Sequence, residues 1–392
     1  MSKTFKTVFI LLLAAAVAGP LFGLNIPPGP IVLYPPDVAV FILNLWIITK
    51  WSEVVKLYRQ RLEFKAFSAF VIIALLSWLL SPLSLSASDK GIALLYLLRF
   101  AAYFQIYPAV LVSLKMNPPI RKFFTRLIIL SGIVLIVLGW FQYFLYPDLR
   151  NLYYLGWDPH YFRIFSTILD PNYFGLILVL FFLFSLSLQQ VFYRQILIKL
   201  VVLATLAFTY SRSSYLAFLS GILYWAYLSR RLLKYFLAGI IFFGSLFLLP
   251  RPGGVGVELE RIFTVRERLN NWQQAVEIIS DKPFLGIGFN TLRFKIRDDK
   301  RSSEDWRTNH AAGGVDNSLL FVAASSGLTG LAVYLVFLIS VFRKLNKIGK
   351  SMMISVIVHS LFLNSLFYTY ILIWLYILSA LMQKEVKGNT QV

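Results

Sequence analysis

The 392-residue chain has no cysteine, only three histidines and few charged residues, which make up 14% of its length. Without cysteine, disulfides and thiolate-ligated metals are excluded. Soluble domains carry about 25% charged residues, so a soluble class is excluded as well. The sequence also contains no Walker-type phosphate loop and no Ser-x-x-Lys, His-Glu-x-x-His or Asp-x-Asp motif. We therefore expect any catalysis to need neither a metal nor a cofactor, and to depend on positioning, arginine electrostatics and a base.

Hydrophobic residues, in contrast, make up 58% of the chain. They form repeated runs of about 17 to 25 residues, long enough to cross a bilayer as helices, and strand-like alternation is missing. The sequence therefore predicts an all-α integral membrane protein with about twelve transmembrane helices. The spans are placed at residues 7–24, 31–49, 66–86, 91–113, 127–146, 172–190, 197–211, 213–228, 235–249, 316–342, 352–365 and 367–382. An open alternative joins the last two spans into one long helix.

The net charge of +20 is concentrated in alternate loops. Loops and tails on the side of the N-terminus contain 22 of the 38 Lys and Arg residues but three of the 18 acidic residues, whereas the opposite short loops contain five of each. An excess of Lys and Arg marks the cytoplasmic loops of membrane proteins. We therefore predict a multi-pass protein of the cytoplasmic (inner) membrane with both termini in the cytoplasm and no nucleic-acid partner. The first span lacks a small-residue cleavage site before Asn25, which favours a retained signal-anchor helix.

One long polar segment interrupts the apolar runs and divides the chain into three parts. These are a transmembrane bundle of about nine helices (1–249), a large extracytoplasmic loop (250–315), and C-terminal transmembrane helices with a short cytoplasmic tail (316–392). Within the loop, apolar residues recur at steps of three and four from Ile262 to Ile279, which predicts an amphipathic helix with one apolar face. The Gly286-Ile287-Gly288 turn that follows allows a close backbone approach.

Three arginines lie where the predicted outer face meets the membrane. Arg163 precedes a span, Arg212 lies in a tight turn between two spans, and Arg268 lies on the loop helix. An arginine at the bilayer boundary costs free energy unless it is paired or solvated, and its planar donor fork matches phosphate oxygens. These side chains are therefore candidate ligands of a diphosphate-bearing lipid. The open alternative is that Arg212 snorkels to the interface and Arg268 faces solvent.

A general base needs a suitable pKa and must reach the proton it removes. His310 and Asp316 are candidates because both lie where the long loop re-enters the membrane. His160 is interpreted as a packed residue, and His359 as a packed or helix-capping residue in the cytoplasmic half of the membrane. Residues 146–163 are rich in Tyr and Trp, and they form either an interfacial aromatic belt or a platform on which sugars stack.

Segments of the predicted outer face together resemble the O-antigen ligase and polymerase superfamily of membrane glycosyltransferases. The matching segments are the Ser-Arg turn Thr209–Ser213, the Arg-x-x-x-Trp pair Arg268 and Trp272, the Gly-x-Gly segment Pro283–Gly288, and Asp316–Leu331. Weaker similarity begins at Arg163 and at Asp170-Pro171-Asn172. The resemblance covers residues 163–333.

The resemblance implies a transferase on the outer face of the membrane. Such an enzyme moves a glycan from an undecaprenyl-diphosphate carrier to a hydroxyl of an acceptor glycan or lipid, with inversion. It implies that Arg212 and Arg268 hold the diphosphate and that Arg163 assists. The family has His directly before the Asn of its last motif, where this chain has Asp316. Either Asp316 is the base or the loop brings His310 into place. This departure favours a polymerase-like member or a related glycan-transferring enzyme over a lipopolysaccharide ligase.

Two other classes of protein remain open. A flippase or transporter for the same lipid-linked oligosaccharide needs a polar path through many spans. Apart from Arg99, the predicted membrane interior is nearly free of charge. A non-catalytic assembly subunit of the cell envelope would not depend on Arg212 or Arg268 for activity.

Overall fold

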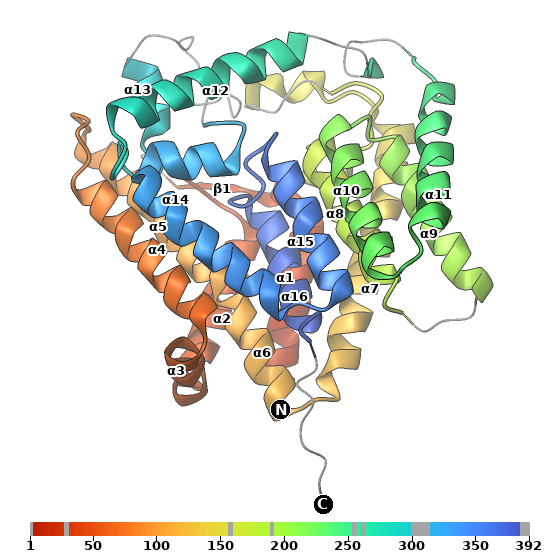
Figure 1. The fold of residues 1–392 in the computed structure, drawn as a ribbon, viewed down its shortest axis with the longest axis horizontal. Coiled ribbons are helices and arrows are strands. Elements are labelled where there is room, and N and C mark those ends of the chain that lie inside the picture. Colours follow the sequence, from red (N-terminus) through yellow and green to blue (C-terminus); the bar gives the residue numbers. More distant parts are fainter. Residues whose placement is uncertain are drawn as a thin grey trace, which may run out of the picture.

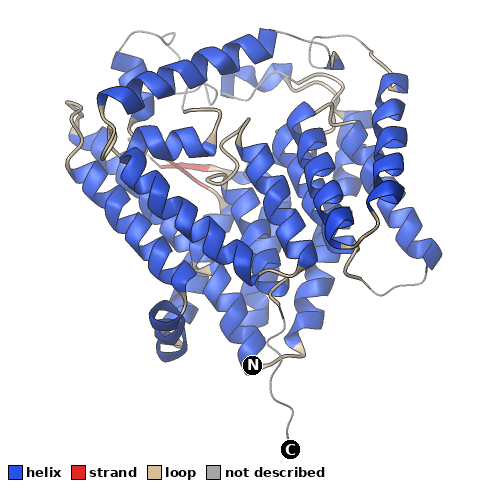
Figure 2. Ribbon diagram, viewed as in Figure 1, coloured by secondary structure: helices blue, strands red, loops and turns tan. Residues whose placement is uncertain are grey.

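The computed structural model describes residues 3–26, 31–155, 160–188, 192–252, 257–259, 263–298 and 314–384, which are mostly α-helical (Figure 1, Figure 2). Every predicted apolar segment contains a helix. These helices are α1 (Lys3–Ala18), α2 (Pro35–Ile48), α4 (Leu62–Leu79), α5 (Ala87–Phe104) with α6 (Ile106–Met116), α7 (Ile120–Leu145), α8 (Pro171–Ser185), α9 (Phe192–Ala207), α10 (Arg212–Leu228), α11 (Leu232–Ser245), α14 (Ser318–Lys344), α15 (Lys347–Ser360) and α16 (Thr369–Leu381). The alternative of one long C-terminal helix is wrong, because residues 361–368 separate α15 from α16.

Five helical stretches of the described residues are long and apolar enough to cross a membrane, by length and composition. They are Thr4–Phe22, Leu62–Leu79, Ala87–Met116, Ile120–Leu145 and Ser318–Lys344. A sixth is obtained if α2 and α3 (Trp51–Gln60), which meet at a bend of 91°, count as one broken span. Other apolar helices, including α8 and α16, are shorter. The chain is thus a multi-pass helical membrane protein.

Several short elements are not evident in the hydropathy pattern. They are α3, α13 (Leu292–Asp298), the strands β1 (Leu24–Ile26) and β2 (Ile31–Leu33), and the 3-10 turns η1 (Gly19–Phe22), η2 (Arg150–Leu155), η3 (Ser166–Ile168) and η4 (Leu246–Leu248). The two strands pair antiparallel, with Asn25 opposite Val32. They are too short to show the period-two pattern over several residues that identifies a strand in a sequence.

The long polar segment contains the amphipathic helix α12 (Phe263–Asp281), which lies across one end of the bundle (Figure 1). Its buried residues include Ala275 and Ile278, whereas Leu269 and Val276 are 55% and 51% exposed. The apolar face predicted from the sequence contains both exposed residues, together with Trp272 and Ile279, which pack against the bundle. The bundle end that α12 covers selects the buried face, and periodicity alone does not define that end.

Small residues allow the short helices around α10 to pack closely. A Cβ atom on Gly221 of α10 would lie 2.0 Å from the hydroxyl of Ser355 in α15, and one on Gly175 of α8 would lie 2.4 Å from the hydroxyl of Ser214 in α10. Helices in membranes associate through such small-residue contacts, because lipid offers little hydrophobic driving force between them. The close packing places the starts of α8 and α10 beside the end of α15.

At the end of the bundle away from α12, basic side chains contact neighbouring helices. Lys6 of α1 lies 5.8 Å from the ring centroid of Phe123 in α7, and Arg121 of α7 donates to the carbonyl of Leu381 in α16 at 2.6 Å. Arg61 donates to the Gln383 side chain at 2.7 Å and pairs with the buried Glu63 at 2.6 Å. The start of α1 and the end of α16 therefore share one end of the bundle, away from α12 (Figure 1).

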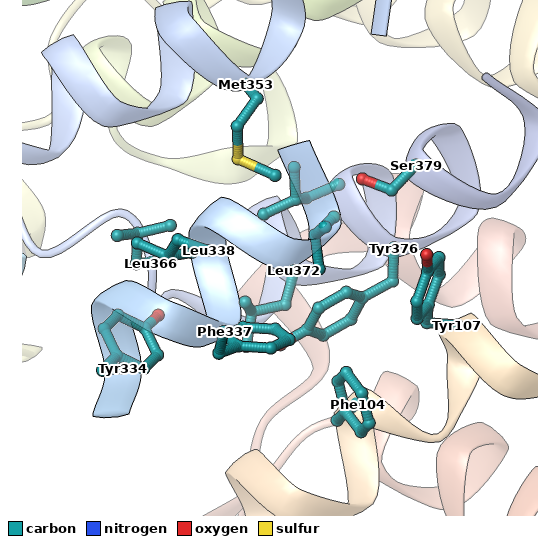
Figure 3. Close-up of a pocket in the computed structure, with 12 residues that line it drawn as sticks. Phe104, Tyr107, Tyr334, Phe337, Leu338, Met353, Leu366, Leu372, Tyr376 and Ser379 are labelled. Carbon is teal, nitrogen blue, oxygen red and sulfur yellow. The ribbon is translucent and has the colours of Figure 1, made fainter. Parts of the chain in front are cut away.

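The bundle interior is packed with aromatic and aliphatic side chains. Between α6, α14, α15 and α16 it leaves a narrow apolar cavity whose lining includes Tyr107, Phe337, Met353 and Tyr376 (Figure 3). Among the described residues, the candidate diphosphate ligands and the candidate bases predicted from the sequence do not line this cavity. The candidate site lies instead at the bundle end beneath α12.

Candidate functional site

The Ser-Arg turn connects α9 to α10 and makes Arg212 the first residue of α10. Tyr210 adopts a left-handed backbone conformation (φ 49°), which reverses the chain, and its hydroxyl donates to the carbonyl of Pro250 at 2.5 Å. The Ser211 hydroxyl then accepts a hydrogen bond from the Ser214 amide and caps the helix. This capping satisfies one of the free amides of the first turn. Arg212 is half-buried, and its guanidinium donates to the carbonyl of Leu259 at 3.3 Å.

Arg163 lies behind this turn and is only 3% exposed. Its guanidinium donates to the Thr209 carbonyl at 2.8 Å, to the Asn172 side-chain oxygen at 3.3 Å and to the Tyr210 carbonyl at 3.5 Å. The structure therefore brings Arg163 beside the Ser-Arg turn but directs its donors toward protein groups, which include these oxygens and Nδ1 of His160 at 3.5 Å. In this geometry Arg163 holds the turn that presents Arg212.

The start of α8 joins the same cluster through Asn172. The Asp170 carboxylate caps α8 by accepting from the amides of Asn172 at 2.6 Å and Tyr173 at 3.2 Å, and burial raises the pKa of this carboxyl group. The Asn172 side-chain oxygen accepts from the Ser211 hydroxyl at 2.9 Å, and its backbone carbonyl accepts from the Ser214 hydroxyl at 2.9 Å. Asp170-Pro171-Asn172 is thus the support of the Ser-Arg turn.

His359 contacts the first turn of α10, which sequence reasoning did not anticipate. It is fully buried at the end of α15, with its Nε2 atom 3.1 Å from the Asn172 carbonyl and 3.3 Å from the hydroxyls of Ser213 and Ser214. The interpretation of a packed residue in the cytoplasmic half therefore misplaces it, because it lies with the turns predicted for the outer face. An intramembrane histidine is itself a signal of function, and that signal was available in the sequence.

The helix α12 carries Arg268, and hydrogen bonds of Asn271 and Trp272 fix this helix to the segment before α14. The Asn271 side chain accepts from the Asp316 amide at 2.9 Å and donates to the Gly314 carbonyl at 3.2 Å. The Trp272 indole donates to the Asp316 carbonyl at 3.3 Å. Because Arg268 and Trp272 are four residues apart, they lie on the same face of the helix. The Arg-x-x-x-Trp pattern therefore directs Arg268 toward the same end of the bundle as Asp316.

The positive charge of Arg268 acts on Arg212. Burial and the like charge of Arg268 lower the pKa of Arg212, which lies just before the predicted span 213–228. Two neighbouring guanidinium groups repel each other, and an anion between them relieves that repulsion. Among the three predicted diphosphate ligands, Arg268 is therefore near enough for its charge to act on Arg212, and Arg163 contacts the turn that precedes Arg212.

The Gly-x-Gly segment pairs its backbone with a break in helix α14. Helix α14 breaks at Gly327 (φ 70°, ψ 179°), and the amides of Ile287 and Gly288 donate to the freed carbonyls of Ala324 and Ser325, both at 3.0 Å. A Cβ atom on Gly327 would lie 2.0 Å from the Phe284 carbonyl oxygen. A broken helix in a membrane needs such internal partners for its backbone. The expected close backbone approach is thus made to α14.

The starts of α8, α10 and α14 converge on the turn between α15 and α16. The Ser318 hydroxyl, in the first turn of α14, donates to the Leu363 carbonyl at 3.3 Å and accepts from the Leu366 amide at 3.2 Å. Ser365 of the same turn lies 2.6 Å from Nδ1 of His359. Helix N-termini carry partial positive charge and attract anions. Together with Arg212 and Arg268, they make this bundle end suited to binding a phosphate-bearing ligand.

Other nominated residues are only partly described. His310 lies outside the described residues, so the structure does not place it. Asp316 precedes Asn317, whose side chain caps α14 by accepting from the amides of Leu319 and Leu320. In the aromatic outer segment, Arg150 lies 4.1 Å from the ring centroid of Tyr161. Within the described part of the chain, no three His, Cys, Asp or Glu side chains are grouped as a metal site would require.

These features define a multi-pass helical membrane protein in which helix N-termini and Arg212 lie at the bundle end covered by the amphipathic helix α12, which carries Arg268. Residues 197–335 of this chain match the family described as O-antigen ligase. No curated protein matches the chain. The match confirms the resemblance read from the motifs, and it includes the turn of Arg212, Arg268 and Asp316. At the level of the family, the chain is similar to membrane glycosyltransferases of the ligase and polymerase type, which act in O-antigen and polysaccharide biosynthesis.

Proposed function

We propose that this protein is an inverting glycosyltransferase of the outer face of the cytoplasmic membrane. It transfers or polymerises a glycan from an undecaprenyl-diphosphate carrier onto a hydroxyl of an acceptor glycan or lipid. The observation that carries the proposal is that Arg212, the first residue of α10, lies close enough to Arg268 of α12 for the charge of Arg268 to lower its pKa. Two half-buried like charges, one of them at a helix N-terminus, suit a doubly charged diphosphate, which each planar guanidinium can bind through two oxygens.

The proposed topology has about twelve spans and both termini in the cytoplasm. The chain then comprises a transmembrane bundle (1–249), an extracytoplasmic loop (250–315) and C-terminal spans (316–392). Its support is the distribution of charge, because Lys6, Arg61 and Arg121 gather at the bundle end away from α12. Cytoplasmic loops carry such an excess of basic residues. The arginine pair then faces the compartment in which the lipid carrier presents its glycan.

In the proposed reaction the acceptor oxygen attacks the anomeric carbon from the face opposite the diphosphate. The bond between this carbon and the phosphate oxygen breaks, and Arg212 and Arg268 stabilise the negative charge that develops on the leaving diphosphate. Asp316 or His310 takes the proton of the acceptor hydroxyl. Arg163 holds the turn that carries Arg212. Direct attack with one displacement inverts the anomeric configuration and needs no metal.

The deciding experiment is product analysis with a purified undecaprenyl-diphosphate-linked glycan and the full-length protein. We expect glycan transfer by the wild type, loss of transfer by Arg268→Ala, and loss by one of the two base variants, Asp316→Asn or His310→Ala. Transfer that survives both base variants would refute the assignment of the base. If the purified protein moves the lipid between leaflets without forming a glycosidic bond, the flippase alternative replaces the enzyme.

A further inference from the structure

His359 lies outside the family match at residues 197–335, yet it contacts the turn that carries the matched Arg212. It is buried at the end of α15, where it meets the first turns of α8 and α10 and the turn between α15 and α16. An ionisable side chain among apolar helices is costly unless its polar atoms are satisfied. Both ring nitrogens of His359 have partners, so its contacts define which parts of the protein it joins.

The partners fix the tautomer of the imidazole. The Asn172 carbonyl, 3.1 Å from Nε2, can only accept a hydrogen bond, so the proton lies on Nε2. Nδ1 is then the acceptor for the Ser365 hydroxyl at 2.6 Å. The ring consequently has one orientation, in which it links the first turn of α8 to the turn after α15 and presents Nε2 toward α10.

The same nitrogen reaches the residues that follow Arg212. The hydroxyls of Ser213 and Ser214 each lie 3.3 Å from Nε2, and both side chains are buried. Ser214 also donates to the Asn172 carbonyl, and its amide donates to the Ser211 cap. With one proton on Nε2, the imidazole offers a single shared N–H whose acceptors are the Asn172 carbonyl and the hydroxyl oxygens of Ser213 and Ser214. This shared bond joins the ring to the first turn of α10 on its inner side, as Arg163 holds the preceding residues. Arg212 projects from the segment that these contacts immobilise.

We propose that His359 is a positioning residue that fixes the first turn of α10 so that Arg212 meets the diphosphate of the lipid carrier. The proposal rests on the proposed function, and it extends the site beyond the family match to the end of α15. His359 does not touch the substrate in this scheme. A guanidinium held in one orientation loses less conformational freedom on binding than a mobile one, which strengthens bidentate contact.

The test measures binding of undecaprenyl diphosphate to the full-length protein in nanodiscs, together with the melting temperature of each variant. His359→Met keeps a similar volume but removes the hydrogen bonds, whereas His359→Gln can return a donor near the position of Nε2. The matched control is Ser355→Ala. Ser355 is buried in the same α10–α15 contact and donates to the Ala217 carbonyl at 2.8 Å, but this bond lies away from the Arg212 turn.

We expect His359→Met to weaken binding about tenfold, His359→Gln to restore most of the affinity, and Ser355→Ala to leave it unchanged. Residues that act through one another are not additive, so Arg212→Ala combined with His359→Met should bind no more weakly than Arg212→Ala alone. A merely structural histidine would instead lower the melting temperature and weaken binding to the same extent in both backgrounds. If His359→Met does not insert, His359→Gln and Ser365→Ala are compared in the same double-variant cycle.

The outcomes separate this inference from the proposed function. Binding that responds to Arg212→Ala but not to His359→Met overturns the positioning role and leaves the proposed function intact. Additive losses in the double variant also overturn it. If the wild type does not bind undecaprenyl diphosphate, or if Arg212→Ala binds it as well as the wild type does, the proposed function fails and the positioning role fails with it.

Discussion

Arg163 and Arg212 lie on either side of one turn, and the protein uses them differently. Arg163 is 3% exposed and donates to several protein oxygens, the closest at 2.8 Å. Arg212 is half-buried, has a longer bond of 3.3 Å to Leu259, and lies beside a second positive charge. A guanidinium surrounded by hydrogen-bond acceptors of the protein stabilises the fold, whereas one near a second positive charge suits an anionic ligand. The comparison separates a frame, made of Arg163, Asn172 and the Gly327 break, from the arginine pair.

The largest expected effect is a loss of stability when Gly327, at the break in α14, is replaced. Gly327→Ala introduces a Cβ atom 2.0 Å from the Phe284 carbonyl oxygen, at a positive φ of 70°. We expect a loss of more than about 3 kcal/mol of stability, and with it the loss of glycan transfer, because the backbone itself must move. Thermal unfolding in detergent measures the effect. The control is Gly91→Ala, where a Cβ atom would meet nothing within 4 Å. A Gly327→Ala protein with normal stability would show that the break is not needed.

Variants of Arg212 and Arg268 should lose glycan transfer without losing stability, unlike variants of the frame. Arg212→Lys keeps the charge but loses the planar fork, so we expect transfer to fall about 100-fold while the melting temperature stays unchanged. Arg150→Lys is the control, because Arg150 is an exposed arginine paired with Asp148 at 2.7 Å. The measurement is the initial rate of glycan transfer at saturating acceptor. A Lys variant of Arg212 with full activity would remove the distinction between the pair and the frame.

Arg163→Lys should behave as a frame variant. Lysine cannot reach the Thr209, Asn172 and Tyr210 oxygens together, so we expect a loss of about 2 kcal/mol of stability with a smaller proportional loss of transfer. Thermal unfolding and transfer rates on the same preparation measure both quantities. If transfer falls as steeply as in Arg212→Lys while stability is retained, Arg163 belongs with the diphosphate ligands, as the sequence resemblance implies.

The smallest expected effect is at the cap of α8. Asp170→Ala removes the cap and should cost about 1 kcal/mol, whereas Asp170→Asn keeps an accepting oxygen and should cost less. Burial raises the pKa of Asp170, so its contribution to stability is fully present below the unfolded pKa and is lost as the pH rises through the folded pKa. The Asn variant should lack this part of the pH dependence, which thermal unfolding across the pH range measures. If the wild type and Asp170→Asn show the same dependence of stability on pH, Asp170 does not have a raised pKa in the folded protein.

The sequence by itself determined much of this protein. Its apolar runs fixed where helices form, because a helix is the structure that satisfies the backbone in lipid, and every predicted segment contains one. Spacing within the polar segment located α12 and placed Trp272 on the same face as Arg268. The motifs identified the family resemblance that residues 197–335 confirm. These features are local, so they can be read from neighbouring residues.

Only the tertiary structure decided which polar groups meet. Asn172 and His359 are 187 residues apart in sequence, yet they are hydrogen bonded, because close packing of α8, α10 and α15 joins their ends. It also buried Arg163 while leaving Arg212 half-buried, although both read as boundary arginines, and it turned Leu269 and Val276 of α12 outward. Burial and partner choice depend on how distant helices pack, and hydropathy and local spacing contain no information about those contacts.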